Sequence, residues 1–195
     1  MIKKTTFIGD THGKFNDLNR IIKCLPNNRI IQIGDLGIGF AGYPYTASFP
    51  ANFSFIRGNH DNPQKCKEHP NYIGEYGTKD EFFYISGAFS IDKDSRTQGI
   101  DYWDNEELSH LQLIECVELF TKKKSQFVFS HDCPLSIKYE LGFFGFDTRT
   151  QYAMQQMFEC HQPELWIFGH YHISRKLEIN GTKFVCLNEL ETYTI

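Results

Sequence analysis

Near its start the chain reads Thr5-Thr6-Phe7-Ile8-Gly9-Asp10-Thr11-His12, a short apolar run that stops at a glycine and continues into two residue types that bind metal ions. Continuous apolar runs of this length are typical of strands that are covered on both faces. In α/β proteins, ligand sites collect where loops leave the carboxyl ends of strands. The stretch therefore predicts a buried strand that carries candidate metal ligands at its end.

The same pattern recurs further along the chain. The later apolar runs are Arg29 to Ile33, Asn52 to Ile56, Gln126 to Phe129 and Leu165 to Phe168. The polar motifs that follow them are Gly34-Asp35, Gly58-Asn59-His60-Asp61, Ser130-His131 and Gly169-His170-Tyr171-His172. Because strand ends of this kind can converge on one cleft, we expect a single hydrolytic site with two metal ions. Oxygen and imidazole ligands without thiolates favour Mn first, then Fe, Zn, Co or Mg, over a closed structural zinc site.

Helical patterns separate the apolar runs. Residues 15–25, 105–122 and 147–160 place apolar side chains at helical spacing, and Asn105 is expected to cap the second of these helices. From residue 81 to 91, and again from residue 174 to the C-terminus, the pattern changes to shorter aromatic and β-branched runs. Asn180-Gly181 is a hairpin signal within the latter segment. These patterns indicate two packed β-sheets with helices outside.

The composition suits one globular domain that spans residues 1–195. Of the 195 residues, 41% are hydrophobic and 15% are aromatic, so the chain can bury a core and disorder is not expected. The N-terminal apolar run is too short for a signal peptide, and no stretch approaches the length of a membrane span. We therefore expect a soluble cytoplasmic protein without a membrane partner.

The cysteine pattern indicates the cellular compartment, and the net charge limits the classes of partner. The six cysteines are scattered without a Cys-x-x-Cys pair, which favours free thiols in a reducing compartment. A formal net charge of −4 argues against a strong nucleic-acid-binding patch. It does not exclude an anionic substrate, because bound divalent ions are the local charge that matters. No pattern in the sequence favours one oligomeric state.

In order and spacing, the motifs resemble the calcineurin-like metallophosphoesterase family. Its signature is Asp-x-His, Gly-Asp, Gly-Asn-His-Asp or Gly-Asn-His-Glu, a lone His and Gly-His-x-His, and here the matching residues run from Asp10 to His172. The resemblance implies an α/β fold, a four-layer αββα sandwich of two mixed β-sheets flanked by helices. The two sheets inferred from the residue patterns agree with it. It also implies a metal-dependent phosphoric ester hydrolase with two divalent metal ions.

The resemblance further implies a role for each motif residue. The implied metal ligands are Asp10, His12 and His172 for one ion, Asn59, His131 and His170 for the other, and Asp35 as the bridge. His60 is implied to protonate the leaving oxygen or to stabilise the transition state, with Asp61 orienting it. A hydroxide that bridges the ions would attack phosphorus directly, without a covalent enzyme intermediate.

Substrate-binding residues are harder to assign. The candidates are Asn59 and Arg96, of which Arg96 lies in the polar loop from Ser90 to Gly99. The planar fork of Arg96 suits bidentate contact with phosphate, and an exposed charged loop explains the residue equally well. Phe143-Phe144-Gly145-Phe146 is a candidate for base stacking or for a lid, and core packing explains these aromatics at least as well.

A departure from related phosphatases narrows the substrate class. Serine/threonine phosphatases of this superfamily carry Gly-Asp-x-Val-Asp-Arg-Gly, whose Arg contacts phosphate, where this chain has Gly34-Asp35-Leu36-Gly37-Ile38-Gly39-Phe40. We therefore predict a small capless phosphodiesterase that hydrolyses phosphodiester or nucleotide-type bonds, with nucleotides or cyclic nucleotides as possible substrates. The alternatives are a serine/threonine-type protein phosphatase and a catalytically silent binding scaffold. Retention of His60 and of every ligand position disfavours the scaffold.

Overall fold

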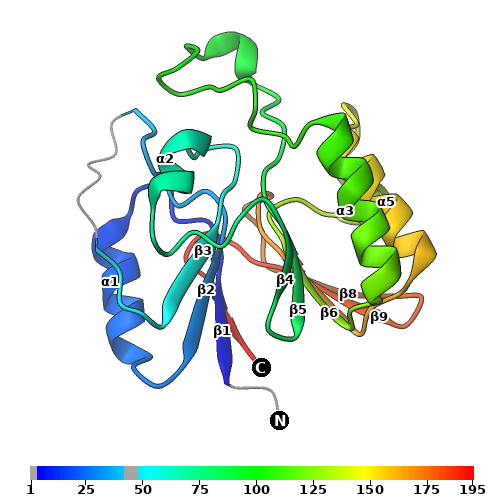
Figure 1. Cartoon of the computed structure of the whole chain (residues 1–195), viewed down its shortest axis with the longest axis horizontal. Helices are drawn as coiled ribbons and strands as arrows, with labels where there is room; N and C mark the ends of the chain where they lie inside the picture. Colours follow the sequence, from blue (N-terminus) through cyan, green and yellow to red (C-terminus); the bar gives the residue numbers. More distant parts are fainter. Residues whose placement is uncertain (1–3, 42–47) are drawn as a thin grey trace.

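The strands form two sheets that lie face to face, with helices on both outer sides (Figure 1). The structure is a computed structural model that describes residues 4–41 and 48–195, so the first three residues of the N-terminal stretch lie outside it. The strands are β1 (Thr5–Ile8), β2 (Arg29–Ile33), β3 (Phe53–Ile56), β4 (Tyr76–Lys79), β5 (Phe82–Ile85), β6 (Phe127–Ser130), β7 (Leu165–Phe168), β8 (Arg175–Ile179), β9 (Thr182–Cys186) and β10 (Thr192–Thr194). The helices are α1 (Phe15–Cys24), α2 (Pro63–Glu68), the 3-10 helix η1 (Lys93–Ser95), α3 (His110–Lys123), α4 (Leu135–Glu140) and α5 (Arg149–Cys160).

Both sheets are mixed, as the family resemblance implies. In the four-stranded sheet, ordered β10-β1-β2-β3, the strands β1, β2 and β3 are parallel and β10 is antiparallel to β1. In the six-stranded sheet, ordered β4-β5-β6-β7-β9-β8, the four central strands are parallel and the two edge strands are antiparallel to their neighbours. The carboxyl ends of parallel strands share one edge of a sheet. This topology brings the motif loops after β1, β2, β3, β6 and β7 to the upper end of the molecule in Figure 1.

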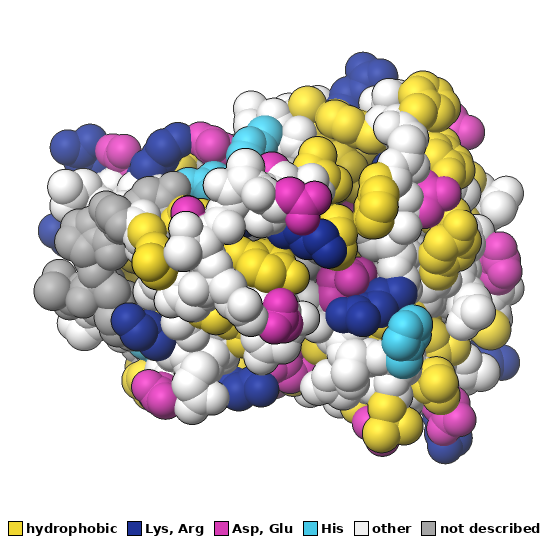
Figure 2. Space-filling view, turned by 90° about the horizontal axis from the view of Figure 1, so that it is seen from above, with side chains coloured by type: hydrophobic (Ala, Val, Ile, Leu, Met, Phe, Trp, Pro, Cys, Tyr) yellow, Lys and Arg dark blue, Asp and Glu magenta, His cyan; other side chains and the backbone are white. Residues whose placement is uncertain are grey.

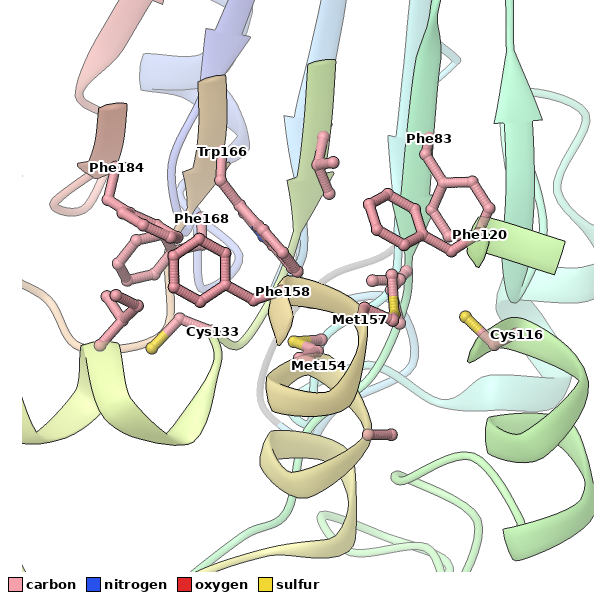
Figure 3. Close-up of a cluster of buried hydrophobic side chains, with 14 of the residues drawn as sticks. Phe83, Cys116, Phe120, Cys133, Met154, Met157, Phe158, Trp166, Phe168 and Phe184 are labelled. Atoms are coloured by element: carbon pink, nitrogen blue, oxygen red, sulfur yellow. The ribbon is translucent and has the colours of Figure 1, made fainter. Parts of the chain in front are cut away.

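Three apolar clusters hold the layers together. Between the sheets, Phe7 of β1 packs against Phe129 of β6 with ring centroids 5.4 Å apart. Helices α1 and α2 cover the four-stranded sheet, and α3, α4 and α5 cover the six-stranded sheet, where Met157 and Trp166 lie in the cluster of Figure 3. The Trp166 Nε1 donates a hydrogen bond to Ser130 Oγ at 2.8 Å, which ties this core to the strand end before His131. The order helix, sheet, sheet, helix confirms the predicted αββα sandwich.

The predicted strands end within one residue of the observed ones, but one predicted helix start is wrong. The chain does not enter α3 at Asn105, because Ser109 caps this helix instead. The Ser109 hydroxyl accepts the Gln112 N–H at 3.3 Å, and the Gln112 side chain accepts the Ser109 N–H at 3.0 Å. The hairpin signal is confirmed, since Asn180 and Gly181 have φ of 52° and 80° between β8 and β9. None of the helices in the described ranges is long and apolar enough to cross a membrane.

Candidate metal centre

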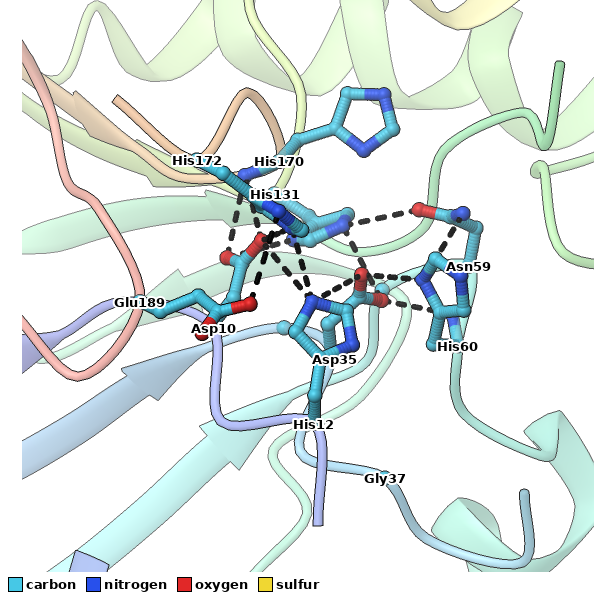
Figure 4. Close-up of polar contacts among 12 residues, drawn as sticks. Asp10, His12, Asp35, Gly37, Asn59, His60, His131, His170, His172 and Glu189 are labelled. Atoms are coloured by element: carbon cyan, nitrogen blue, oxygen red, sulfur yellow. Dashed lines mark hydrogen bonds and ion pairs between the residues drawn. The ribbon is translucent and has the colours of Figure 1, made fainter. Parts of the chain in front are cut away.

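The loops after five parallel strands meet at one place on the molecule. Figure 4 shows the side chains of Asp10, His12, Asp35, Asn59 and His131 turned toward one another. The space-filling view from above, onto this end of the strands, shows histidine side chains that reach the surface beside acidic ones (Figure 2). The convergence that the sequence predicts is therefore present in the fold.

The first half-site consists of Asp10, His12 and His172 with the shared Asp35. One ligand atom from each of these residues lies within 4.8 Å of all the others. The His12 and His172 Nε2 atoms are 2.9 Å apart, and the His172 Nε2 lies 3.1 Å from Asp10 Oδ2. Two buried carboxylates and two imidazoles at this spacing form an oxygen and nitrogen donor set that suits Mn, Fe or Zn. Glu189, which the sequence did not single out, lies 3.7 Å from the other ring nitrogen of His172.

The residues predicted for the second half-site are Asn59, His131 and His170 with the same Asp35. His131 Nε2 lies 3.1 Å from Asn59 Oδ1 and 3.3 Å from Asp35 Oδ1, and all three side chains are buried. His131 Nδ1 donates to the backbone carbonyl of Ile33 at 3.0 Å, which leaves Nε2 to face the ligand cluster. Histidines that bind metals almost always use their second nitrogen in this way. The donor atoms of Asn59, His131 and Asp35 therefore suit a second ion.

His170 is the predicted ligand whose ring is not turned toward the others. Its backbone N–H donates to the Asp10 carboxylate at 3.1 and 3.2 Å, so the loop itself contributes to the first half-site. Its ring packs edge-to-face on His131, with centroids 5.0 Å apart, and Figure 4 shows the ring pointing away from Asp35. The role of His170 as a ligand remains a prediction that requires a change of its side-chain rotamer.

His60 reaches the cluster through Asp35 rather than through Asp61. The Asp35 carboxylate lies 2.7 Å from His60 Nδ1 and accepts the His60 backbone N–H at 2.7 Å. Asp61 instead accepts backbone N–H groups of Gly37, Ile38 and Gly58 at 2.7, 3.0 and 2.9 Å. We expected Asp61 to orient the His60 ring, but the hydrogen bonds of its carboxylate in the described residues hold the loops after β2 and β3 together. Burial and the nearby Asp35 raise the pKa of Asp61.

Histidine and carboxylate side chains shift one another's pKa values in this cluster. Burial lowers the pKa of His131, but the charge and hydrogen bond of Asp35 outweigh it and raise that pKa to about 10. Burial likewise opposes ionisation of Asp35, yet His131 and His60 hold its pKa well below the ordinary value. For His60, burial is again outweighed by Asp35, so its pKa is raised. Burial lowers the pKa of His12. The negative charge of Asp35 that favours these protons also favours a bound cation.

The backbone at several ligands lies in a sparsely populated region. His12, Asp35, His170 and His172 have φ of 46°, 54°, 69° and 51°. Left-handed backbone is uncommon outside glycine and concentrates at functional sites, where the surrounding structure compensates for the strain. Close packing adds a second constraint at Gly58, where a Cβ atom would overlap the Asp35 carboxylate and His131 Nε2.

Arg96 lies beside His60, so an exposed charged loop does not describe it. Its side chain is 9% exposed, and its Nη2 contacts His60 Nε2. Nη1 donates to Ser90 Oγ at 3.0 Å, Nε donates to Asp92 at 3.0 Å, and the guanidinium lies 5.6 Å from the centre of the Phe40 ring. These contacts fix a positive charge next to the ring that we expect to act on the leaving group.

The aromatic segment after α4 is not part of the core. Phe144 and Phe146 are 79% and 64% exposed, while Phe143 packs on Tyr171 with centroids 4.9 Å apart. The Tyr171 ring in turn lies 5.1 Å from the ring of His170, so Phe143 is connected to a proposed ligand through one aromatic ring. Core packing is therefore the wrong explanation for Phe144 and Phe146, and their role as a stacking surface or lid remains a prediction.

Three buried polar residues that the sequence analysis did not identify as candidates form hydrogen bonds near the site. Gln32 was visible as a polar residue inside an apolar run, and its side chain binds the backbone carbonyls of Gly9 and Gly34, which joins two motif loops. Ser90 and Glu106 are 2% and 3% exposed and lie behind Asn59. No periodicity marks them, because they come from irregular segments that only the fold brings together.

A comparison with family models agrees with the resemblance that the motifs carry. The family model described as calcineurin-like phosphoesterase matches residues 3–174. GAP50, described as the anchor in the inner membrane complex of Plasmodium, is 12% identical, with a TM-score of 0.51 over 96% of this chain and 72% of that chain. Phosphopantetheinyl hydrolase from Mycobacterium tuberculosis is 12% identical, with a TM-score of 0.43 over 96% and 90% of the two chains. At such identities the likeness to GAP50 shows the fold alone. No protein of curated function matches the sequence.

Proposed function

Because this chain belongs to the calcineurin-like phosphoesterase family and is therefore a metal-dependent phosphoester hydrolase, we propose that it works with two divalent ions on phosphodiester or nucleotide-type substrates. Cyclic nucleotides belong to the same proposed class. The proposed ligands are Asp10, His12 and His172 for the first ion, Asn59, His131 and His170 for the second, and Asp35 as the bridge. Manganese is the ion that we expect to support the highest activity, ahead of Fe, Zn, Co and Mg.

The observation that carries the proposal is the position of Asp35 between two sets of donors. Its Oδ2 lies 3.7 Å from His12 Nε2, and its Oδ1 lies 3.3 Å from His131 Nε2. A carboxylate in that position has one oxygen for each half-site. When bound, a pair of ions at such a centre activates water and neutralises charge that develops on the phosphoryl group.

The remaining side chains act on the leaving group. His60 holds its Nδ1 against Asp35 at 2.7 Å, so the opposite ring atom, Nε2, is available to give a proton to the leaving oxygen. The guanidinium of Arg96, which only donates, lies against this same atom, so Nε2 would carry the proton once a phosphate oxygen takes the Arg96 donor in its place. Asp92 and Ser90 hold Arg96 in place, which limits the entropy lost on substrate binding.

The preference for diesters is supported by what surrounds His60. The loop after Asp35 has no arginine, and its Phe40 ring lies 5.0 Å from the His60 ring and 6.1 Å from Trp103. An apolar, aromatic surface beside the leaving-group acid favours a second ester group over a free phosphate oxygen. Nothing in the site favours the protein-phosphatase or scaffold alternatives over this assignment.

Metal content and substrate preference test the proposal together. The metal-free protein would be reconstituted with each candidate ion, and hydrolysis of bis-para-nitrophenyl phosphate compared with that of para-nitrophenyl phosphate. We expect two ions per chain by elemental analysis and faster cleavage of the diester. One ion per chain would contradict the dinuclear centre, and a faster monoester reaction would contradict the diester preference. The Asp35→Asn variant controls for contaminating phosphatases.

We also propose a reducing compartment such as the cytoplasm. All six cysteines are free thiols, and four of them are buried. Burial raises the pKa of the Cys116 thiol to about 12, which keeps it protonated and unreactive. Fractionation of cells that produce the protein, followed by thiol titration of the unfolded chain, would test the proposal. Disulfides in the freshly isolated protein would contradict it.

A further inference from the structure

Behind Asn59 lies a chain of buried hydrogen bonds that the proposed reaction does not use directly. Asn59 Nδ2 donates to Ser90 Oγ at 3.0 Å, and Ser90 Oγ donates to Glu106 Oε2 at 2.6 Å. Arg96 Nη1 also donates to Ser90 Oγ, at 3.0 Å. Asn59, Ser90 and Glu106 are each at most 3% exposed, so water does not substitute for these partners.

The polarity of this chain is fixed by the Ser90 hydroxyl. A hydroxyl has one proton and two lone pairs. The two groups Arg96 Nη1 and Asn59 Nδ2 are donors only, so they occupy the lone pairs, and the proton of Ser90 goes to the Glu106 carboxylate. With its NH₂ group bound in this way, Asn59 directs its Oδ1 toward His131 Nε2, at 3.1 Å.

We propose that Glu106 is a positioning residue that acts through Ser90 on both Asn59 and Arg96. It keeps the Asn59 carboxamide oxygen, rather than its NH₂ group, directed at the second metal ion. The same hydroxyl holds Arg96 with its other nitrogen, Nη2, against His60. One buried carboxylate thus orders a ligand of the second half-site and the charge beside the leaving-group acid. The inference rests on the proposed function, since it takes Asn59 as a metal ligand.

The surroundings of Glu106 support a positioning role. Besides Ser90, its carboxylate accepts the Trp103 backbone N–H at 3.2 Å. Burial raises the pKa of Glu106 to about 7, so the site is an unfavourable place for a carboxylate. The adjacent Glu107 has a different task, because it accepts the Thr150 N–H and hydroxyl at 3.1 and 2.9 Å, at the first turn of α5. Glu107 is therefore a matched control. It is the next residue in the sequence, it is also buried, and among the described residues it has no hydrogen bond to Ser90.

Glu106→Gln is a sharp probe because it keeps the size of the side chain but replaces one acceptor by a donor. Glu106 faces two donors, the Ser90 hydroxyl and the Trp103 N–H, and a carboxamide accepts from only one of them through its oxygen. If the side chain of Glu106 is needed only for packing, the protein tolerates this exchange. If it is needed to accept the hydrogen bond of the Ser90 hydroxyl, the exchange disrupts the chain of hydrogen bonds.

The first experiment needs no metal ion. NMR of the metal-free protein would follow exchange of the Asn59 side-chain NH₂ protons with solvent. We expect exchange to become about tenfold faster in Ser90→Ala and in Glu106→Gln, corresponding to the loss of one buried hydrogen bond, and to stay unchanged in Glu107→Gln. Unchanged protection in both Ser90→Ala and Glu106→Gln would overturn the inference. Ser90→Ala removes a single oxygen, so it serves as the test if Glu106→Gln does not fold.

The second experiment separates this inference from the proposed function. Calorimetric titration of metal-free protein with Mn²⁺ would resolve the two ions. We expect Glu106→Gln to weaken the second ion by roughly 10–100-fold, with the first ion unchanged, and the double variant with Ser90→Ala to be no worse than Ser90→Ala alone. If wild type and Glu106→Gln both bind two ions, and the affinity for each ion is the same in the two proteins, the inference is overturned while the proposed function stands. A wild-type protein that binds one ion would overturn the dinuclear function as well.

Discussion

The two proposed half-sites of the metal centre are built in different ways. In the first, the ligands contact each other, and His172 is 43% exposed at the surface. In the second, His131 also contacts Asn59 and Asp35, but Asn59 is held from behind by Ser90, and His170 has its ring turned away. The first half-site is thus preassembled by its own ligands, whereas the second depends on residues behind it. We expect the first ion to bind more tightly and the second to exchange more readily.

The change that breaks both half-sites at once is Asp35→Asn. Its φ of 54° is one that Asn adopts readily, so the backbone is kept while the shared negative charge is lost. We expect both ions to be weakened and turnover to fall on the order of a thousandfold or more. Elemental analysis and diester hydrolysis would measure these effects.

The matched control for this change is Asp80→Asn. Asp80 has the same φ of 54°, and its carboxylate pairs with Arg29 away from the metal centre. Its replacement should leave metal content and rate unchanged. Wild-type turnover in Asp35→Asn would mean that no bridging charge is needed and that the half-sites are not linked.

His60→Ala should separate chemistry from metal binding. We expect turnover to fall by roughly 10²–10⁴-fold, because the leaving oxygen loses its proton donor, while both ions remain. Metal content by elemental analysis and the rate on bis-para-nitrophenyl phosphate are the two measurements. The control is His110→Ala, an exposed histidine at the start of α3. Loss of metal from His60→Ala would show that His60 belongs to the second half-site rather than to the leaving group.

The half-sites can be weakened one at a time through His170 and His172. Glycine is the replacement of choice, because both residues have positive φ. We expect His172→Gly to weaken the first ion and His170→Gly the second, each by roughly 10–100-fold in calorimetric titration. The comparison between the half-sites fails if His170→Gly leaves both affinities unchanged, since its ring would then not turn toward the second ion.

Most of the candidate metal ligands could be predicted because they directly follow the predicted strands in the sequence. Asp10 directly follows the first apolar run and its glycine, so strand period and motif order were enough to predict both the fold class and the convergence of the loops. The helix start at Asn105 was mispredicted because a nearby polar residue competed with the true cap, Ser109, whose partner Gln112 completes the capping box. Local patterns do not decide between two such caps, and in the fold Glu106 and Glu107 are buried ahead of the helix.

Contacts across the fold were beyond the reach of local patterns. Asp61 was expected to orient its neighbour His60, but its carboxylate reaches Gly37 and Ile38, more than twenty residues earlier in the chain. Ser90 and Glu106 meet only because the loop between them folds back over Asn59. Sequence spacing reports which residue types are present at strand ends, and it does not report which side chain will accept a given hydrogen bond.

The smallest expected effect concerns the residue behind the second half-site. The pKa of Glu106 rises from an ordinary value of 4.5 to about 7 on folding, chiefly through burial. The folded protein therefore keeps this proton while the unfolded chain loses it, so stability that is fully present below the unfolded pKa is lost as the pH rises toward 7. We expect this group to destabilise the metal-free protein by about 1–3 kcal/mol at about pH 8 relative to about pH 5.

Glu106→Gln should remove this loss, because a carboxamide does not ionise. Urea unfolding of metal-free wild type and variant at the two pH values would measure the difference between them, with Glu107→Gln as the control for a buried neighbour. Parallel pH dependence in wild type and Glu106→Gln would contradict the raised pKa. A variant that is more stable at the higher pH, yet binds the second ion more weakly, would show that the second half-site keeps its order at a cost in stability. The first half-site has a carboxylate neighbour too, Glu189 beside His172, but that side chain is 30% exposed, so its ionisation costs less than that of the buried Glu106.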